Sequence, residues 1–324
     1  MTAWWFARLP AERLAALRVL VGGFALLYLA ARFGYLDAAG HLPAATWKPL
    51  GVVRLICDQP IAPGAWTALL VATLLLAATF TCGIAHRWLA PPFAALLLFV
   101  LTYRTSWSQV FHTDNLLVLH VAVLALAPAA DVWSSDRWRR ARRGAPAPEP
   151  DGRYAWAVRT AAAMTVATYL LAGVAKLRIA GLDWLAGDNL RNQIAFDNLR
   201  KVLLGDRFAT LASPLLEHPG LFAVLAALTL VVELGAPAAL LGGRVAAVWA
   251  LAAWGFHVGI VALMFIVFPY PLAGVAFAPL FAVERPLAWL ARRWRARSRE
   301  APASGDVASG TPSPARSSRR RPRT

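Results

Sequence analysis

Two ionisable side chains interrupt apolar segments of the chain where an ordinary membrane-spanning helix would carry none. Lys176 stands at the end of Tyr154–Leu177, and Glu233 lies in the short run Val231–Gly235. A charge inside bilayer hydrocarbon costs about 3 kcal/mol or more at the centre. Such a residue is therefore either an anchor that reaches the interface or a working group.

Two histidines are expected at the same depth as Lys176. His112 opens the fourth apolar segment and Lys176 ends the fifth, so both lie near the outer side if the chain begins in the cytoplasm. His257 follows Arg244 by 13 residues, and a helical rise of ~1.5 Å per residue places it roughly 20 Å above the inner face. We therefore expect His112, Lys176 and His257 to converge in the outer half of a helix bundle.

Further polar and aromatic side chains of these segments would line the pocket formed by that convergence, and they are Tyr169, Asp114, Glu233 and Trp254. Tyr169 shares a helical face with Lys176. Structural roles are the alternative. Lys176 would then be an interfacial anchor. Asp114 and His120 would cross-link helices by hydrogen bonds, and Glu233 would pair with a neighbouring Arg or His.

The composition identifies the chain as an all-α, polytopic integral membrane protein. Hydrophobic residues make up 59% of the sequence, the mean hydropathy is +0.53, and apolar runs recur at membrane-spanning length. Most of the net charge of +16 lies in Arg137–Arg143 and in the tail from Arg285 onward. Juxtamembrane arginines of this kind orient spans in the bilayer, so no nucleic acid is expected as a partner. Cys57 and Cys82 lack metal-ligand spacing, and no metal is predicted.

Eight apolar segments predict about eight spans, the last one short because Pro269 and Pro271 interrupt the helix before it. The alternative is seven spans followed by a turn or re-entrant piece after Pro269. The segments are Leu14–Phe33, Ala65–Ala85, Leu89–Tyr103, Val110–Ala130, Tyr154–Leu177, Gly220–Leu241, Arg244–Phe268 and Leu272–Val283. Basic residues concentrate in alternate loops, which predicts that both termini are cytoplasmic and that the protein is a multi-pass protein of the cell (inner) membrane.

Two regions are predicted along the chain: a transmembrane bundle over residues 1–285 and a cationic cytoplasmic tail over residues 286–324. The tail is rich in Ser, Pro, Gly and Arg, has no apolar periodicity and is predicted to be disordered. No internal repeat is evident, which disfavours a transporter built from inverted repeats.

Three blocks of sequence together resemble the vitamin K-dependent gamma-glutamyl carboxylase and its bacterial relatives with the horizontally transferred transmembrane (HTTM) domain. The blocks are Thr105–Trp107 with His112 downstream, Tyr169–Leu177 followed by Asp183–Gly187, and Phe256-His257 followed by Phe268–Tyr270 and Ala278–Phe281. Their order is that of the family, and the resemblance covers roughly residues 10–285. It implies a carboxylase-like transmembrane fold, and it adds Trp184 to the candidate pocket.

The resemblance also implies roles for three residues and a cofactor. Lys176 matches the base that deprotonates vitamin K hydroquinone, and partial desolvation would favour the neutral amine that a base needs. His257 matches a histidine beside that site, and His112 stands one residue early in the family's Asn-His-x-x-Leu pattern. A reduced naphthoquinone is the implied cofactor. In the family its anion reacts with oxygen, and the stronger base so formed removes a glutamate γ-proton before carboxylation by carbon dioxide.

One departure from the carboxylases bears on the function. Those enzymes carry a large extracytoplasmic domain after the bundle that recognises propeptides, and this sequence has a cationic tail there instead. The leading hypothesis is a quinol-dependent carboxylase or oxidase acting on an unknown acceptor, either a secreted peptide or a small molecule. The alternatives are an accessory protein in maturation of, or tolerance to, a secreted peptide, and a small-solute or proton transporter.

Overall fold

The structure is a computed structural model that describes residues 2–107, 110 and 112–289. Helices and the turns between them make up this part of the chain, and no strand occurs among the described residues. One isolated antiparallel bridge joins Leu9 to Asp151. The chain divides into two compact units, Met1–Glu284 and Arg285–Thr324. The disorder predicted for the tail concerns residues that lie almost entirely outside the described ones.

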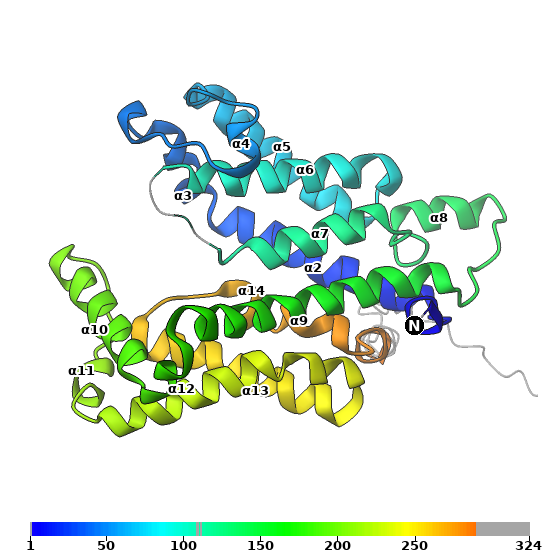
Figure 1. The fold of residues 1–324 in the computed structure, drawn as a ribbon. Coiled ribbons are helices and arrows are strands. Elements are labelled where there is room, and N and C mark those ends of the chain that lie inside the picture. The colour runs from blue at the N-terminus through cyan, green and yellow to red at the C-terminus, as the bar shows by residue number, and fades with distance from the viewer. Residues whose placement is uncertain (1, 108–109, 111, 290–324) are drawn as a thin grey trace, which may run out of the picture. The chain divides into compact units, whose positions relative to one another are not determined.

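The helices follow one another along the chain with short connections (Figure 1). The α-helices are α1 (Thr2–Trp5), α2 (Ala11–Ala31), α3 (Phe33–Ala38), α4 (Gly51–Arg54), α5 (Pro63–Cys82), α6 (His86–Thr105), α7 (Asn115–Leu126), α8 (Ser135–Arg142), α9 (Gly152–Ala180), α10 (Asp188–Leu203), α11 (Ala212–Leu215), α12 (Pro219–Leu234), α13 (Gly243–Met264) and α14 (Pro269–Leu272). The 3-10 helices are η1 (Ala39–His41), η2 (Ala44–Thr46), η3 (Gly181–Ala186), η4 (Ala236–Leu241) and η5 (Val275–Leu280).

Five segments of the described chain are long and apolar enough to cross a membrane: α2, α5, α6, α9 with η3, and α13. Helices α7 and α12 are apolar but have only 12 and 16 residues. The eighth predicted span, Leu272–Val283, holds no spanning helix, because Pro271 and Pro279 leave a four-residue α14 and the short η5. The prediction of eight spans is therefore not confirmed, and the orientation of the termini stays a prediction.

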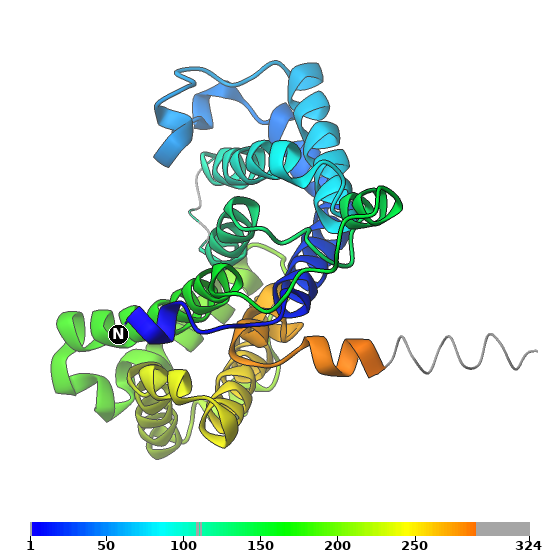
Figure 2. The ribbon, with the colours of Figure 1, turned by 90° about the vertical axis from the view of Figure 1, so that its right-hand side faces the viewer.

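The first group of helices packs around α2, which contacts α5, α7 and α9, and α6 lies between α5 and α7. A second group is formed by α9, α12, η4 and α13. In Figure 2 the blue and cyan helices of the first group and the yellow-green helices of the second group form two neighbouring sets. Each group has its own core of buried side chains, such as Leu17 and Phe80 in the first and Ala253 and Phe277 in the second.

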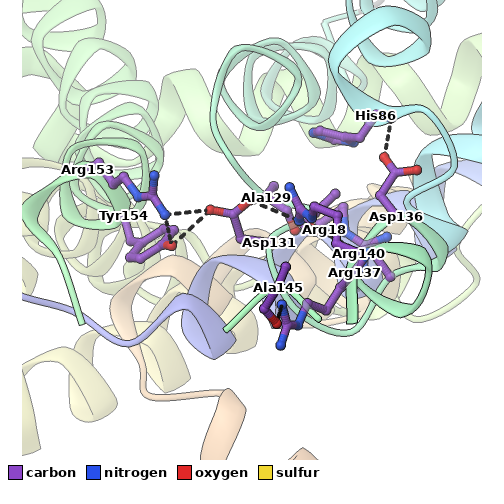
Figure 3. A network of polar contacts seen from close by, with 12 residues as sticks. Arg18, His86, Ala129, Asp131, Asp136, Arg137, Arg140, Ala145, Arg153 and Tyr154 are labelled. Carbon is purple, nitrogen blue, oxygen red and sulfur yellow. Dashed lines mark hydrogen bonds and ion pairs between the residues drawn. The ribbon is translucent and has the colours of Figure 1, made fainter. Parts of the chain in front are cut away.

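A buried arginine holds the first group together at one end. Arg18 of α2 is 0% exposed, and its guanidinium donates to the carbonyl oxygens of Phe80, Thr81, Ala129 and Trp133. Phe80 and Thr81 lie in the last turn of α5, where helix carbonyls lack some of their internal donors, and Ala129 and Trp133 belong to the turn after α7. Figure 3 shows the contact between Arg18 and Ala129. The arginine therefore donates to backbone carbonyl oxygens, and these hydrogen bonds offset part of the free-energy cost of burying its charge.

A buried histidine joins the two groups. His120 of α7 is 0% exposed; its Nε2 donates to the carbonyl of Ala161 on α9 at 3.0 Å, and its Nδ1 accepts from the Tyr270 hydroxyl of α14 at 2.7 Å. Thr165 of α9 lies 3.2 Å from the same Nε2 and donates to the carbonyl of Ala276 in η5 at 2.9 Å. The structural interpretation of His120, a cross-link between helices, fits these contacts.

Helix α10 caps the C-terminal end of α13 in the second group. The Asn198 amide donates to the carbonyl of Leu263 at 2.9 Å, and the Lys201 ammonium donates to the carbonyl of Met264. These bonds occupy carbonyls at the end of α13 that have no intrahelical partner. His257 lies two turns before this capped end of α13.

We expect Arg18→Ala to destabilise the protein by on the order of 3 kcal/mol or more, because the carbonyls around the guanidinium would lose their donor inside the bundle. Thermal unfolding in mild detergent, followed by fluorescence, measures the loss. Arg54→Ala on exposed α4 is the matched control and should melt like the wild type. Equal melting temperatures for the two variants would contradict the role assigned to Arg18.

Topology can be tested on either side of α9. This helix has 29 residues, about 43 Å at ~1.5 Å per residue, which is enough to cross a bilayer. A reporter fused after Gly144, behind the arginines of α8, should be active only in the cytoplasm, and one fused after Gly205 only outside. The same activity at both positions would contradict α9 as a span, and a reversed pattern would contradict the predicted orientation.

Candidate functional site

Lys176 and Glu233 form an ion pair between α9 and α12. The ammonium of Lys176 donates to Oε1 of Glu233, and the side chains are 22% and 2% exposed, respectively. A Cβ atom added to Gly173, one turn before Lys176, would lie 2.9 Å from the Cβ of Glu233. The glycine therefore lets α12 approach α9 closely enough for the pair to form. Pairing is what a buried carboxylate in an apolar bundle requires.

Lys176 does not lie at the end of its apolar segment, which extends ten residues beyond it to Ala186. Helix α9 continues to Ala180 and η3 continues the apolar stretch to Ala186. The indole ring of Trp184, on η3, lies 5.4 Å from the Lys176 nitrogen, an arrangement that stabilises an ammonium group. Lys176 is thus enclosed by a carboxylate and an aromatic ring and is not placed as a free interfacial anchor.

Tyr169 and His257 form a second polar pair on the same face of α9. The Tyr169 hydroxyl lies 2.8 Å from Nε2 of His257 on α13, and both residues are buried. The rings of Trp249 and Phe277 surround the tyrosine, with centroids 5.1 and 6.2 Å from its own. Tyr169 precedes Lys176 by two helical turns, about 10 Å along the axis. The two pairs therefore follow each other along one stripe of α9.

His112 reaches this region through a shared aromatic neighbour. Its side chain is exposed, and its ring centroid lies 5.6 Å from that of Phe268, which in turn lies 5.0 Å from the ring of His257. The predicted convergence thus takes the form of a row of contacts. His112 and His257 share Phe268, and His257 connects to the Lys176 stripe through Tyr169.

Two predicted pocket residues lie elsewhere. Asp114 accepts a hydrogen bond from Tyr28 at 2.8 Å and pairs with Arg104 at 3.5 Å, so it joins α7 to α2 and α6. Trp254 is 41% exposed and donates to the carbonyl of Leu272 at 3.0 Å. A span beginning at Val110 would bring Asp114 alongside Lys176. In the structure α7 begins only at Asn115, and Asp114 faces the first group of helices.

Sequence reasoning missed Arg18, which lies near the start of the first apolar segment. The rule that intramembrane charges have partners was the signal that would have selected it. The sequence places Tyr270 in the proline-rich break and in a block that resembles the family, with no role of its own, yet it is 2% exposed and hydrogen-bonded to His120. No simple sequence signal marks that contact, because the two residues are far apart in the chain.

A comparison with protein families gives one match, in which the model of the HTTM domain covers residues 6–285. The chain belongs to the HTTM domain family. Neither a search of curated proteins nor a search of solved structures gave a match. In this HTTM protein the matched region contains every candidate residue, and membership supports a membrane protein of the carboxylase-associated family.

Three buried polar atoms of the HTTM protein's site have no hydrogen-bond partner among the described residues. They are Oε2 of Glu233, Nε1 of Trp184 and Nδ1 of His257. Buried polar groups are nearly always paired, so each such atom calls for an explanation. These atoms, on α12, η3 and α13 beside α9, comprise one acceptor, one donor and one imidazole nitrogen. A polar ligand with hydroxyl or carbonyl oxygens would form hydrogen bonds with such a set. The described residues contain no group of three metal-ligating side chains.

Breaking the ion pair tests its geometry apart from any activity. We expect Glu233→Gln to destabilise the HTTM protein more than the double variant Lys176→Met/Glu233→Leu, because the single change leaves an ammonium without its counter-charge and the double change removes both charges. Thermal unfolding in detergent gives both values. Glu217→Gln, on an exposed turn, is the control for loss of a carboxylate. A double variant less stable than Glu233→Gln would contradict the pairing argument.

Proposed function

We propose that this HTTM protein is a quinol-dependent membrane enzyme, a carboxylase or oxidase of an unidentified acceptor, with Lys176 as its general base. The observation that carries the proposal is the buried Lys176–Glu233 pair, whose carboxylate keeps one oxygen without a partner among the described residues. Partly enclosed acid and base groups that lie side by side are typical of functional sites.

A reduced naphthoquinone fits the residues that surround the pair. The unpartnered Trp184 Nε1 and Glu233 Oε2 offer a donor and an acceptor for its hydroxyl groups. The buried rings of Trp184, Trp249 and Phe277 make the surroundings of the two polar pairs aromatic, which favours an aromatic ligand over an aliphatic one. When bound, the group would supply an oxidisable diol from which a proton must be removed.

The pair can provide a neutral amine for that step. In a low-dielectric site, an ion pair and its neutral form differ less in free energy than they do in water, because the charges lose hydration. A proton that moves from Nζ of Lys176 to Glu233 leaves an amine with a free electron pair. Lys176 would then take a hydroxyl proton at Nζ and return to the ammonium form.

Tyr169 and His257 would act as positioning groups in this scheme. Their hydrogen bond fixes the imidazole ring, and Nδ1 of His257 is left available for a ligand oxygen whichever tautomer is present. Because the pair lies two turns from Lys176, it would contact the far part of a ligand and not the proton that Lys176 removes.

A proton transporter is the second candidate, and the burial of Glu233 favours it. A carboxylate that is 2% exposed within a membrane bundle is typical of proton relays as well as of enzymes. The two candidates can be told apart by the conditions in which they are active. An enzyme oxidises quinol in detergent solution, whereas the activity of a transporter can be measured only across a sealed membrane.

We expect Lys176→Ala to reduce quinol oxidation by about 10²–10⁴-fold, the usual contribution of a general base. His257→Ala should cost on the order of 10²–10³-fold, and the double variant should be no worse than Lys176→Ala, because both residues serve one step. Oxygen uptake with a reduced naphthoquinone measures these rates. Higher pH should partly restore Lys176→Ala, since the quinol then ionises without a base.

Lys48→Ala, on an exposed loop, is the control for removal of a lysine. Unchanged, pH-independent oxidation in Lys176→Ala would contradict the base assignment. No quinol oxidation by the wild type, together with proton flux into sealed vesicles that Glu233→Gln abolishes, would establish the transporter instead.

A further inference from the structure

A separate pocket lies at the end of the bundle that carries the arginines of α8. It has a volume of about 420 Å³ and is lined by the start of α6, the end of α7 and one side of α8. Its polar side is formed by His86, Arg87 and Arg140 together with two aspartates, and its apolar side includes Leu126, which is 74% exposed. A cavity that is polar on one side and apolar on the other matches the boundary between head groups and acyl chains.

The two aspartates of the pocket are already engaged. Asp136 accepts from the backbone N–H groups of Ala85 and His86, both at 2.8 Å, and so caps α6 (Figure 3). Asp131 accepts from Arg140, Arg153 and Tyr154 at 2.9 to 3.1 Å. Their charges are compensated by the helix end and by these donors, so they do not repel an incoming anion strongly.

The two arginines of the pocket differ in how far they are engaged: Arg140 pairs with Asp131 and donates to the carbonyl of Ala130 at 2.9 Å. Within the described part of the chain, Arg87 makes no ion pair; its guanidinium lies 5.3 Å from the ring of Trp88. Trp88 and Trp138 are 72% and 56% exposed on either side of this end, as expected of residues that sit at head-group level. A phosphate group entering the pocket would find Arg87 at its rim and Arg140 beside it.

His86 supplies the second part of the site. The residue is 4% exposed, its Nε2 donates to the carbonyl of Leu124 at 3.1 Å, and its Nδ1 is buried with no partner among the described residues. The imidazole points away from Asp136 (Figure 3). Because Nε2 carries the proton, Nδ1 is an acceptor that needs a donor. A phosphate alone offers none, whereas a head-group hydroxyl or ammonium does.

We infer that this pocket binds the head group of a glycerophospholipid, with its phosphate at Arg87 and Arg140, a head-group hydroxyl or ammonium donating to Nδ1 of His86, and an acyl chain passing over Leu126. This site is independent of the proposed quinol chemistry. Lipid held here would tie α6, α7 and α8 together at the end where Arg18 also acts.

Phosphatidylglycerol, which carries both a phosphate and hydroxyl donors, is the probe. The full-length protein in mild detergent is titrated with dioleoyl phosphatidylglycerol, and bound lipid is counted by native mass spectrometry. We expect saturable binding that Arg87→Gln weakens by about tenfold or more, the loss of one charge-assisted contact. Arg139→Gln, an exposed α8 arginine outside the pocket, is the control and should weaken binding by about twofold or less.

Four outcomes would overturn the inference. Equal losses in Arg87→Gln and Arg139→Gln would mean diffuse attraction to a basic surface. Equal binding of dioleoyl phosphatidylcholine, whose head group has no hydrogen-bond donor, would remove the role given to His86. Competition by inorganic phosphate at similar concentration would identify a site for free phosphate and not for lipid. Absence of saturable binding by the wild type would leave no lipid site.

Discussion

The arrangement of the bundle depends on one buried imidazole. His120 has both ring nitrogens hydrogen-bonded, one to α9 and one to α14, and it lies at the junction of the two helix groups. Inside a membrane no water can replace either bond, so separating the groups would leave an imidazole, a hydroxyl and a carbonyl unsatisfied. Apolar contacts alone would let α9 slide along its neighbours, because lipid tails compete for the same surfaces. The directional bonds of His120 therefore fix the register of α9, and with it the depth of every group on its polar stripe.

That stripe combines two requirements that usually oppose each other. Stability favours complete pairing of polar groups in the bundle, yet a functional site needs groups that remain available. Along α9 both are met by partial pairing: Glu233 uses one carboxylate oxygen and His257 one ring nitrogen, and the second atom of each has no partner in the described part of the chain. The Gly173 contact makes this arrangement sensitive to small changes in packing, because any side chain there would move α12 away.

Much of the fold and part of the candidate site could be predicted from the sequence. Apolar runs of spanning length indicate the helical membrane class, and polar residues inside such runs point to Lys176, Glu233 and His257. The pairing of Lys176 with Glu233 could not be predicted, since it depends on the close approach of α12 and on the depth at which that helix ends. The break after Phe268 follows from Pro269 and Pro271 and was predictable, whereas the start of α7 and the second break at Pro279 are local effects that hydropathy does not register. Those effects explain why Asp114 faces another network and why the last apolar segment forms no span.

The carbonyl cage around Arg18 has a consequence for how the chain is made. Its donors and acceptors are separated by 62 to 115 residues in sequence, so the ribosome delivers the arginine well before Phe80, Ala129 and Trp133 exist. At a synthesis rate of about 5–20 residues per second, α2 would wait several seconds or more until Trp133, the last residue that binds Arg18, has been synthesised. During that interval it must stay at the interface, beside the insertion machinery, or with its guanidinium drawn toward head groups. Helix α2 thus reaches its final packed position late in assembly, only after the turn that follows α7 has been synthesised.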